Sequence, residues 1–138
     1  MIGTPEYSLA KYLDSYIKPN IPNSFLLNST SSFINSLNSV SISPSSSYLV
    51  SFDIESLFTN IPLDEVCDIT CDYVYGSLSN KIPPFDKTTF KKLLKLATSG
   101  IFSFNNQLFS QIDGVTMDSP LGPSLANIFL AHLEKNWQ

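Results

Sequence analysis

Residues 47–53 read Ser-Tyr-Leu-Val-Ser-Phe-Asp, and they carry the clearest strand pattern in the chain. Tyr48, Val50 and Phe52 alternate onto one face, while the residues between them point the other way. After a turn, apolar residues at helical spacing predict a helix over residues 63–75. A strand followed by a helix indicates a mixed fold rather than a purely helical one.

Four further helices and a hairpin are predicted outward from this strand. Helix starts or caps are expected at Thr4-Pro5, at Asn28 or Ser29, at Asp86, and at Ser119-Pro120. Residues 101–104 and 107–111 flank Asn105-Asn106, which is a plausible tight hairpin turn. Because helices outnumber strands, we expect an α+β fold with a small antiparallel sheet packed by helices.

Length favours one domain. The chain has 138 residues and a mass of 15.3 kDa. Residues 1–46 form a helical N-terminal part, and residues 47–138 carry the strand, the hairpin and the last helix. The serine-rich stretch between the two parts is interpreted as a linker inside one domain, because neither side could bury a core alone.

Charge argues mildly against a stand-alone nucleic-acid binder. Twelve acids face eight bases, all of them lysine, for a net charge of -4. Nucleic-acid binders normally present a basic face, because phosphate contacts supply most of their affinity. The only basic cluster consists of Lys87, Lys91, Lys92 and Lys95. The acidic face of the helix over residues 63–75 is interpreted as solvated.

The cysteines and the apolar stretches indicate a reducing, intracellular location, nuclear or cytoplasmic. Cys67 and Cys71 lie four residues apart on one predicted helix face, which is a poor geometry for a disulfide. No signal-peptide pattern follows Met1, and no apolar stretch is long enough to span a membrane. A catalytic Ser-His-Asp triad is not expected, because His132 is the only histidine.

Asp53 is the residue whose position most suggests chemistry. It closes an otherwise apolar strand, where a buried carboxylate is costly unless it is paired or bound to a metal. A carboxylate at a strand end can hold Mg²⁺. The alternative is an aspartate that caps the following turn.

Two blocks of sequence resemble the reverse transcriptases, most closely those of Penelope-like retroelements. Residues 51–63, Ser-Phe-Asp-Ile-Glu-Ser-Leu-Phe-Thr-Asn-Ile-Pro-Leu, resemble the first catalytic motif of that family. Residues 113–129, which begin Asp-Gly-Val-Thr-Met-Asp-Ser-Pro-Leu-Gly-Pro, resemble the next motif and its helix. Weaker similarity runs over residues 3–40. The resemblance implies a partial polymerase palm with helices that adjoin the fingers.

The resemblance also implies a two-metal nucleotidyl transfer. Asp53 matches the aspartate that contacts both catalytic Mg²⁺ ions, and the backbone carbonyl of Ile54 matches a further metal ligand. One ion would activate the primer hydroxyl, and the other would hold the triphosphate of the incoming dNTP. The implied partners are an RNA or DNA template-primer and dNTP.

The remaining site residues follow from the same resemblance. Phe58 matches the aromatic steric gate under the incoming sugar, although an ordinary core phenylalanine is the alternative. Met117 and Asp118 match positions beside the nucleotide. Ser119 and Pro120 match a contact with the template backbone, and a helix N-terminus favours phosphate in general.

Three departures from the family pattern indicate a segment that is inactive alone. The third catalytic motif would follow the last helix, but the sequence ends at Gln138. The basic fingers segment would precede Gly3. Asp118 replaces a family glycine, and its charge at ~5 Å from a phosphate would cost about 3 kcal/mol at a protein-like dielectric. The alternative function is a non-catalytic α+β interaction module, or a decayed retroelement remnant that binds a protein. We also expect the unpaired strand at residues 48–53 to leave a marginal or aggregating monomer.

Overall fold

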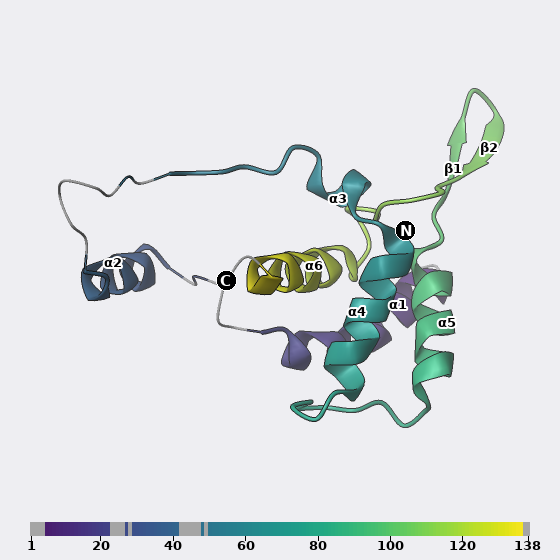
Figure 1. The fold of residues 1–138 in the computed structure, drawn as a ribbon. Helices are drawn as coiled ribbons and strands as arrows, with labels where there is room; N and C mark the ends of the chain where they lie inside the picture. The colour runs from purple at the N-terminus through teal and green to yellow at the C-terminus, as the bar shows by residue number, and fades with distance from the viewer. Residues whose placement is uncertain (1–4, 23–26, 28, 42–47, 49, 137–138) are drawn as a thin grey trace.

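The computed structural model describes residues 5–22, 27, 29–41, 48 and 50–136 of the chain (Figure 1). The elements along these residues are α1 (Pro5–Ile17), η1 (Lys18–Asn20), α2 (Thr30–Ser39), α3 (Leu57–Asn60), α4 (Leu63–Tyr75), α5 (Lys87–Thr98), β1 (Ile101–Phe104), β2 (Gln107–Ser110) and α6 (Gly122–Asn136). The predicted α+β class is confirmed: helices dominate, and the two strands form one antiparallel sheet.

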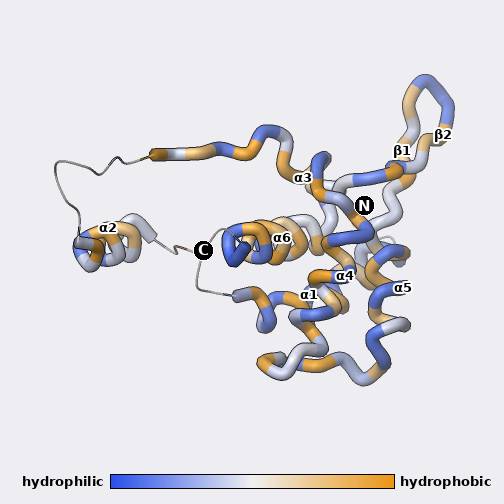
Figure 2. The backbone as a smooth tube through the Cα atoms, in the orientation of Figure 1, coloured by the Kyte–Doolittle hydropathy of each residue, from blue (hydrophilic) through white to orange (hydrophobic). Residues whose placement is uncertain are grey.

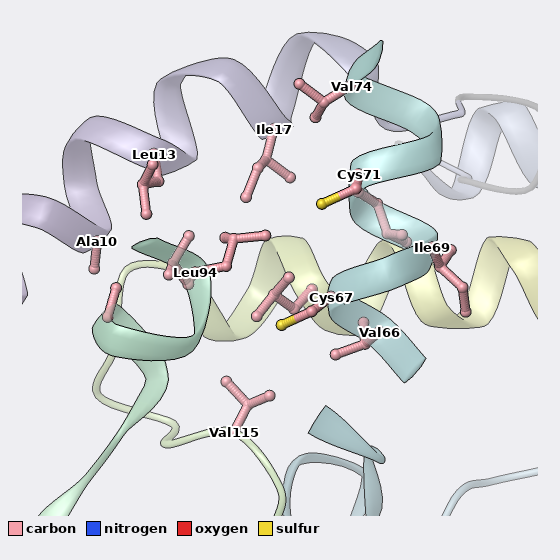
Figure 3. Packing of buried hydrophobic residues seen from close by; sticks show 14 of the residues in the cluster. Ala10, Leu13, Ile17, Val66, Cys67, Ile69, Cys71, Val74, Leu94 and Val115 are labelled. Atoms are coloured by element: carbon pink, nitrogen blue, oxygen red, sulfur yellow. The ribbon is translucent and has the colours of Figure 1, made fainter. Parts of the chain in front are cut away.

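The helical body consists of α1, α4, α5 and α6, which surround one hydrophobic core (Figure 1). Figure 3 shows Leu13 and Ile17 of α1 pointing toward the same interior as Leu94 of α5. Cys67 and Cys71 of α4 line this interior as free, fully buried thiols, as the sequence predicted. No helix of the described chain is both long enough and apolar enough to cross a membrane.

The helix boundaries follow local capping chemistry. The carboxylate of Asp86 accepts a hydrogen bond from the amide of Thr89 at 2.9 Å, and the rings of Phe85 and Phe90 stack with centroids 6.1 Å apart. The cap at Asp86 was predicted from the sequence, and the ring contact is a hydrophobic staple across the same helix start. Ser29 caps α2 in the same way through the amide of Ser32. The residues around each helix start therefore suffice to set the N-termini of α2 and α5.

The start of the last helix differs from the prediction. It was expected at Ser119-Pro120, but α6 begins at Gly122. The preceding residues form tight turns, in which the amide of Ser119 donates to Thr116 O and the amide of Gly122 donates to Ser119 O, both at 3.0 Å. These bonds span three residues, so the α-helical pattern starts only with the bond from Leu125 N to Leu121 O.

The predicted hairpin is present, but the helices do not cover it. Asn105 and Asn106 both have positive φ, 49° and 59°, as a tight turn requires. Phe102 pairs with Phe109 across the strands, and their rings stack at 5.6 Å. Every residue of β1 and β2 is exposed, and the hairpin projects from the helical body (Figure 1). The expectation of a sheet packed by helices was therefore wrong.

The strand predicted over residues 47–53 does not form in the described part of this stretch, residues 48 and 50–53. Residues 48 and 50–54 instead make an extended segment, with Tyr48 91% and Phe52 90% exposed. Figure 2 shows several hydrophobic positions along it. A strand is defined by pairing, and β1 and β2 pair only with each other in the described chain. The alternation of apolar residues indicates which side chains share a face, but it does not provide a second strand for pairing.

A buried asparagine joins the end of α1 to the loop between α4 and α5. The side-chain amide of Asn20 donates to Tyr16 O at 2.8 Å and to Lys81 O at 2.9 Å. Its oxygen accepts from the amide of Asn80 at 2.6 Å and from the hydroxyl of Ser79 at 3.2 Å. The side chain therefore satisfies backbone groups from two segments about 60 residues apart.

Replacing Asn20 with alanine is expected to lower the free energy of unfolding by about 1–3 kcal/mol, because it leaves partly buried backbone groups of Asn80 and Lys81 without this partner. Urea denaturation followed by circular dichroism measures this change. Asn80→Ala is the control, since it removes only an exposed side-chain bond to Pro19 O and should cost less than about 1 kcal/mol. Similar small losses in both variants would contradict the role given to Asn20.

Candidate functional site

Asp53 lies on the exposed extended segment, outside the helical body. Its carboxylate Oδ1 accepts a hydrogen bond from the adjacent amide of Ile54 at 2.9 Å. Residues 50–56, which precede α3, run away from the helical body (Figure 1). Asp53 is thus a solvated carboxylate beside its neighbour's amide, not the closing residue of a buried strand.

The described residues supply only part of a magnesium site. They contain no group of three or more His, Cys, Asp or Glu side chains that could hold a metal ion. Asp53 offers one carboxylate and Ile54 one backbone carbonyl, whereas Mg²⁺ takes six oxygens in octahedral geometry. Most of the coordination would have to come from water and substrate phosphates.

The end of the first sequence block meets the start of the second at a hydrogen-bonded junction, which we define as residues 58–63 and 113–115. The amide of Gly114 donates to Ile61 O at 3.2 Å, and the amide of Val115 donates to Phe58 O at 2.7 Å. Ile61 and Val115 are fully buried. Two segments that are far apart in the sequence are thereby held as one unit.

Asp113 caps α4 from a distant part of the chain. Its Oδ1 accepts from the amide of Leu63, the first residue of α4, at 2.7 Å, and from the amide of Gly114 at 2.9 Å. The residue before the helix, Pro62, offers no side-chain cap. A carboxylate at a helix N-terminus also interacts favourably with the helix dipole. The sequence analysis missed this role, and its only signal was a helix start without a polar capping residue.

Phe58 contacts the hydrophobic core and the start of α6. The residue is half-buried and packs against the core cluster. A Cβ atom placed on Gly122 would lie 3.7 Å from its Cε1 atom. These contacts agree with the alternative of an ordinary core phenylalanine, while its exposed part leaves room for a ligand contact.

The other residues of the candidate site lie in the turns before α6. Met117 and Asp118 are exposed, and Met117 is 70% accessible. Ser119 is buried, with its hydroxyl oxygen accepting from the amide of Leu121 at 3.3 Å, and Pro120 is half-buried. The Ser119 hydroxyl therefore already has a partner within the turn, so the exposed groups here are those of Met117 and Asp118.

A buried carboxylate that the sequence analysis did not single out links α1 to α6. Asp14 is 5% exposed, and its Oδ1 accepts a hydrogen bond from the hydroxyl of Ser124 in the first turn of α6. Its other oxygen forms an ion pair with Lys18 at 2.6 Å. Both carboxylate oxygens are thus engaged, as a buried charge requires.

Lysines of α5 pair with the acidic face of α4, whose aspartates stay exposed to solvent as predicted but also form ion pairs that the sequence analysis did not anticipate. The ion pairs, in order along the two antiparallel helices, are Lys95–Asp64, Lys91–Asp68 and Lys87–Asp72. Hydrogen bonding to the partner aspartates raises the pKa of Lys87 and Lys91, and the bond to Lys95 lowers the pKa of Asp64. Three of the four lysines in the basic cluster are therefore paired with acids, which reduces the positive charge available to a phosphate.

Reversing the charge of Lys91 with Lys91→Glu is expected to lower the melting temperature modestly, because it places a negative charge beside Asp68. The double variant with Asp68→Lys should recover most of this loss by restoring an ion pair. In high salt both differences should shrink, because the groups are exposed and screened. An unrecovered loss in the double variant, measured by thermal denaturation, would show that Lys91 acts through packing instead.

Comparison with known proteins finds no match to this chain, whether by family model, by curated protein or by solved structure. The function therefore has to be argued from the chain's own residues.

Proposed function

We propose that this chain is a segment of an RNA-directed DNA polymerase of the reverse transcriptase type, and that it does not polymerise alone. The observation that carries the proposal is the pair of sequence blocks at residues 51–63 and 113–129, whose facing ends form the junction. In a polymerase, these two blocks have to lie together around one nucleotide. The junction between Phe58 and Val115 is compatible with that requirement, and it supports the proposal without testing it.

The proposal gives roles to residues on both blocks. Asp53, with the carbonyl of Ile54, would contribute to Mg²⁺ binding, and Phe58 would lie under the sugar of the incoming dNTP. Met117 and Asp118, as exposed residues before α6, would face the nucleotide. A template strand would approach the turn that contains Ser119 and Pro120, where backbone rather than the buried hydroxyl would be available.

Two observations support inactivity of the segment alone. Asp53 is one carboxylate, and the described residues contain no group of three or more His, Cys, Asp or Glu side chains that could hold a metal ion. Asp118 adds a like charge near the expected phosphates. Because Asp118 is exposed, water would reduce the repulsion below the value of about 3 kcal/mol for two unit charges ~5 Å apart at a protein-like dielectric. The missing ligands are thus the stronger reason.

A primer-extension assay with Mg²⁺ or Mn²⁺ tests both parts of the proposal. We expect no dNTP incorporation by the 138-residue chain, but weak Mg²⁺-dependent dNTP binding in calorimetry that Asp53→Ala abolishes. Glu55→Ala is the matched control, since it removes an exposed acid two residues away and should leave binding unchanged. If the wild-type chain incorporates dNTP and Asp53→Ala abolishes this incorporation, the proposal that the segment is inactive alone is overturned. Equal binding by wild type and Asp53→Ala would overturn the polymerase assignment.

The exposed hairpin favours a second candidate, a non-catalytic α+β module that binds a protein. Its exposed apolar side chains are Ile101, Phe102, Phe104, Leu108 and Phe109. Exposed apolar groups of this extent mark interaction sites or association liabilities. A monodisperse, cooperatively melting chain without Mg²⁺-dependent nucleotide binding would favour this candidate. An intracellular location belongs to either proposal, on the basis of the free thiols.

A further inference from the structure

We propose that Gln111 is a positioning residue that connects the exposed hairpin to the junction and, through the junction, to Phe58. Gln111 follows β2 directly and is half-buried. Neither sequence block contains it, and the proposed polymerase chemistry does not use it. Its consequence for a nucleotide rests on the proposed function, but its effect on the junction does not.

Three hydrogen bonds place Gln111 between the hairpin and the loop. Its backbone amide donates to Gly100 O at 2.9 Å, which closes the base of the hairpin. Its side-chain Nε2 donates to Asp113 O at 2.9 Å. Its Oε1 accepts from the hydroxyl of Thr116 at 3.2 Å. The side chain therefore bridges both ends of the loop that runs from residue 113 to residue 116.

The base of the hairpin is tightly packed against this bridge. A Cβ atom on Gly100 would lie 3.1 Å from Oγ1 of Thr116 and 3.4 Å from Oε1 of Gln111. Gly100 is also buried, although every residue of the two strands is exposed. Movement of the hairpin about its base would thus press on the side chains that hold the loop.

From the loop, the connection continues to Phe58 through close contacts between backbone atoms. Gly114 lies so close to α3 that an added Cβ would be 2.9 Å from Phe58 O and 2.7 Å from Thr59 O. Val115 N donates to the same Phe58 carbonyl at 2.7 Å. A displacement of the loop must therefore move the backbone of Phe58 or break this bond, because close-packed groups transmit small shifts.

Amide hydrogen exchange measured by NMR tests the connection in the chain itself. In Gln111→Met, which keeps the side-chain length but makes neither side-chain hydrogen bond, we expect the Val115 amide to exchange at least tenfold faster. Core amides of α4 should be unaffected. In Gln111→Glu, which keeps the acceptor for Thr116, the change should be smaller. The control is Gln107→Met on the exposed strand β2, which should leave Val115 unchanged.

Two exchange results would overturn the proposal. One is an unchanged Val115 amide in Gln111→Met. The other is an equal acceleration of all core amides, which would show a general loss of stability. A third variant, Thr116→Val, removes one of the two side-chain bonds and should give an intermediate acceleration at Val115 if the bridge acts as described.

A nucleotide-binding experiment separates this proposal from the proposed function. Where the wild-type chain binds Mg²⁺-dNTP more tightly than Mg²⁺-rNTP, Gln111→Met should reduce that preference several-fold, because Phe58 would be less firmly placed. An unchanged preference would overturn the connection to Phe58. Absence of any nucleotide binding by the wild type would overturn the proposed function, and the exchange results at Val115 would still decide the role of Gln111.

Discussion

Gly114→Ala is expected to lower the free energy of unfolding by about 3 kcal/mol or more. Gly114 has φ +80°, where a side chain costs about 1–2 kcal/mol. An added Cβ would also lie 2.7 Å from Thr59 O, 2.9 Å from Phe58 O and 2.9 Å from Thr59 Cα. These atoms belong to the backbone of α3, so they cannot rotate away, and overpacking of this kind costs about 1–3 kcal/mol more. Urea denaturation measures the total loss in the free energy of unfolding.

Gly100→Ala is the matched control for this prediction. Its added Cβ would meet only the side chains of Thr116 and Gln111, at 3.1 Å and beyond, and these can adjust. We therefore expect a clearly smaller loss than for Gly114→Ala. A native-like midpoint for Gly114→Ala would mean that the loop and α3 do not approach each other this closely.

Alkaline pH is expected to destabilise the chain through its two buried thiols. Burial raises the pKa of Cys67 to about 12 and that of Cys71 to about 11, against about 8.5 for an exposed thiol. Because the folded-state pKa is the higher one, the buried neutral thiols contribute stability that is fully present below pH ~8.5. This contribution is lost as pH rises toward the folded-state pKa values. Each thiol removes at most about 1.4 kcal/mol per pH unit in that window.

Urea midpoints measured between pH 8 and pH ~9.4 test this expectation, because lysines with an ordinary pKa of about 10.4 stay mostly protonated over this range. The double variant Cys67→Ala, Cys71→Ala will be less stable throughout, because it leaves a cavity. Its free energy of unfolding should nevertheless change much less with pH than that of the wild type. Parallel pH profiles for the two proteins would contradict the assignment. Above pH 10, Tyr75 should add to the loss, because burial raises its pKa to about 12.

The elements that were predicted correctly are those governed by local chemistry. The cap of α5 at Asp86 depends on residues within a single turn, and so does the positive-φ pair Asn105-Asn106 of the hairpin. The bounds of α4 follow from the spacing of its apolar residues and from Gly76 after its end. Such features need no knowledge of the rest of the chain.

Apart from the start of α6, which local turns shift to Gly122, the features that the sequence analysis got wrong or missed depended on a distant partner. Alternation at Tyr48 and Phe52 indicates which side chains share a face, but a strand also needs a neighbour, and the described chain provides none there. For the same reason, the sequence analysis missed the cap of α4, because Asp113, which accepts from the amide of Leu63, lies 50 residues further along the chain. Nothing in the local sequence marks Asp14 as buried, and its hydrogen-bond partner Ser124 lies 110 residues further along the chain.

For the candidate site, the sequence placed the two blocks but not their geometry. The resemblance implies that Phe58 of the first block and Met117 of the second lie beside one nucleotide, and the structure joins the two blocks by hydrogen bonds from Gly114 and Val115 to residues 61 and 58. The sequence did not anticipate that Asp53 lies on an exposed segment beyond the junction, because that outcome depends on whether the extended segment finds a pairing partner. The polymerase assignment therefore stays a proposal that rests on the sequence blocks.

The regular spacing of the charges on α4 and α5 has a consequence for how these helices choose their arrangement. The acids stand at 64, 68 and 72 and the lysines at 87, 91 and 95, four residues apart in both cases. Such evenly repeated charges would keep two of the three pairs if one helix slid by a full turn, and all three if it ran in the opposite direction. The three ion pairs therefore attract α4 and α5 to each other without selecting one alignment of the two helices. That choice falls to the buried side chains of the two helices, among them Cys67, Phe90 and Leu94, because a close-packed core accepts few alternative arrangements.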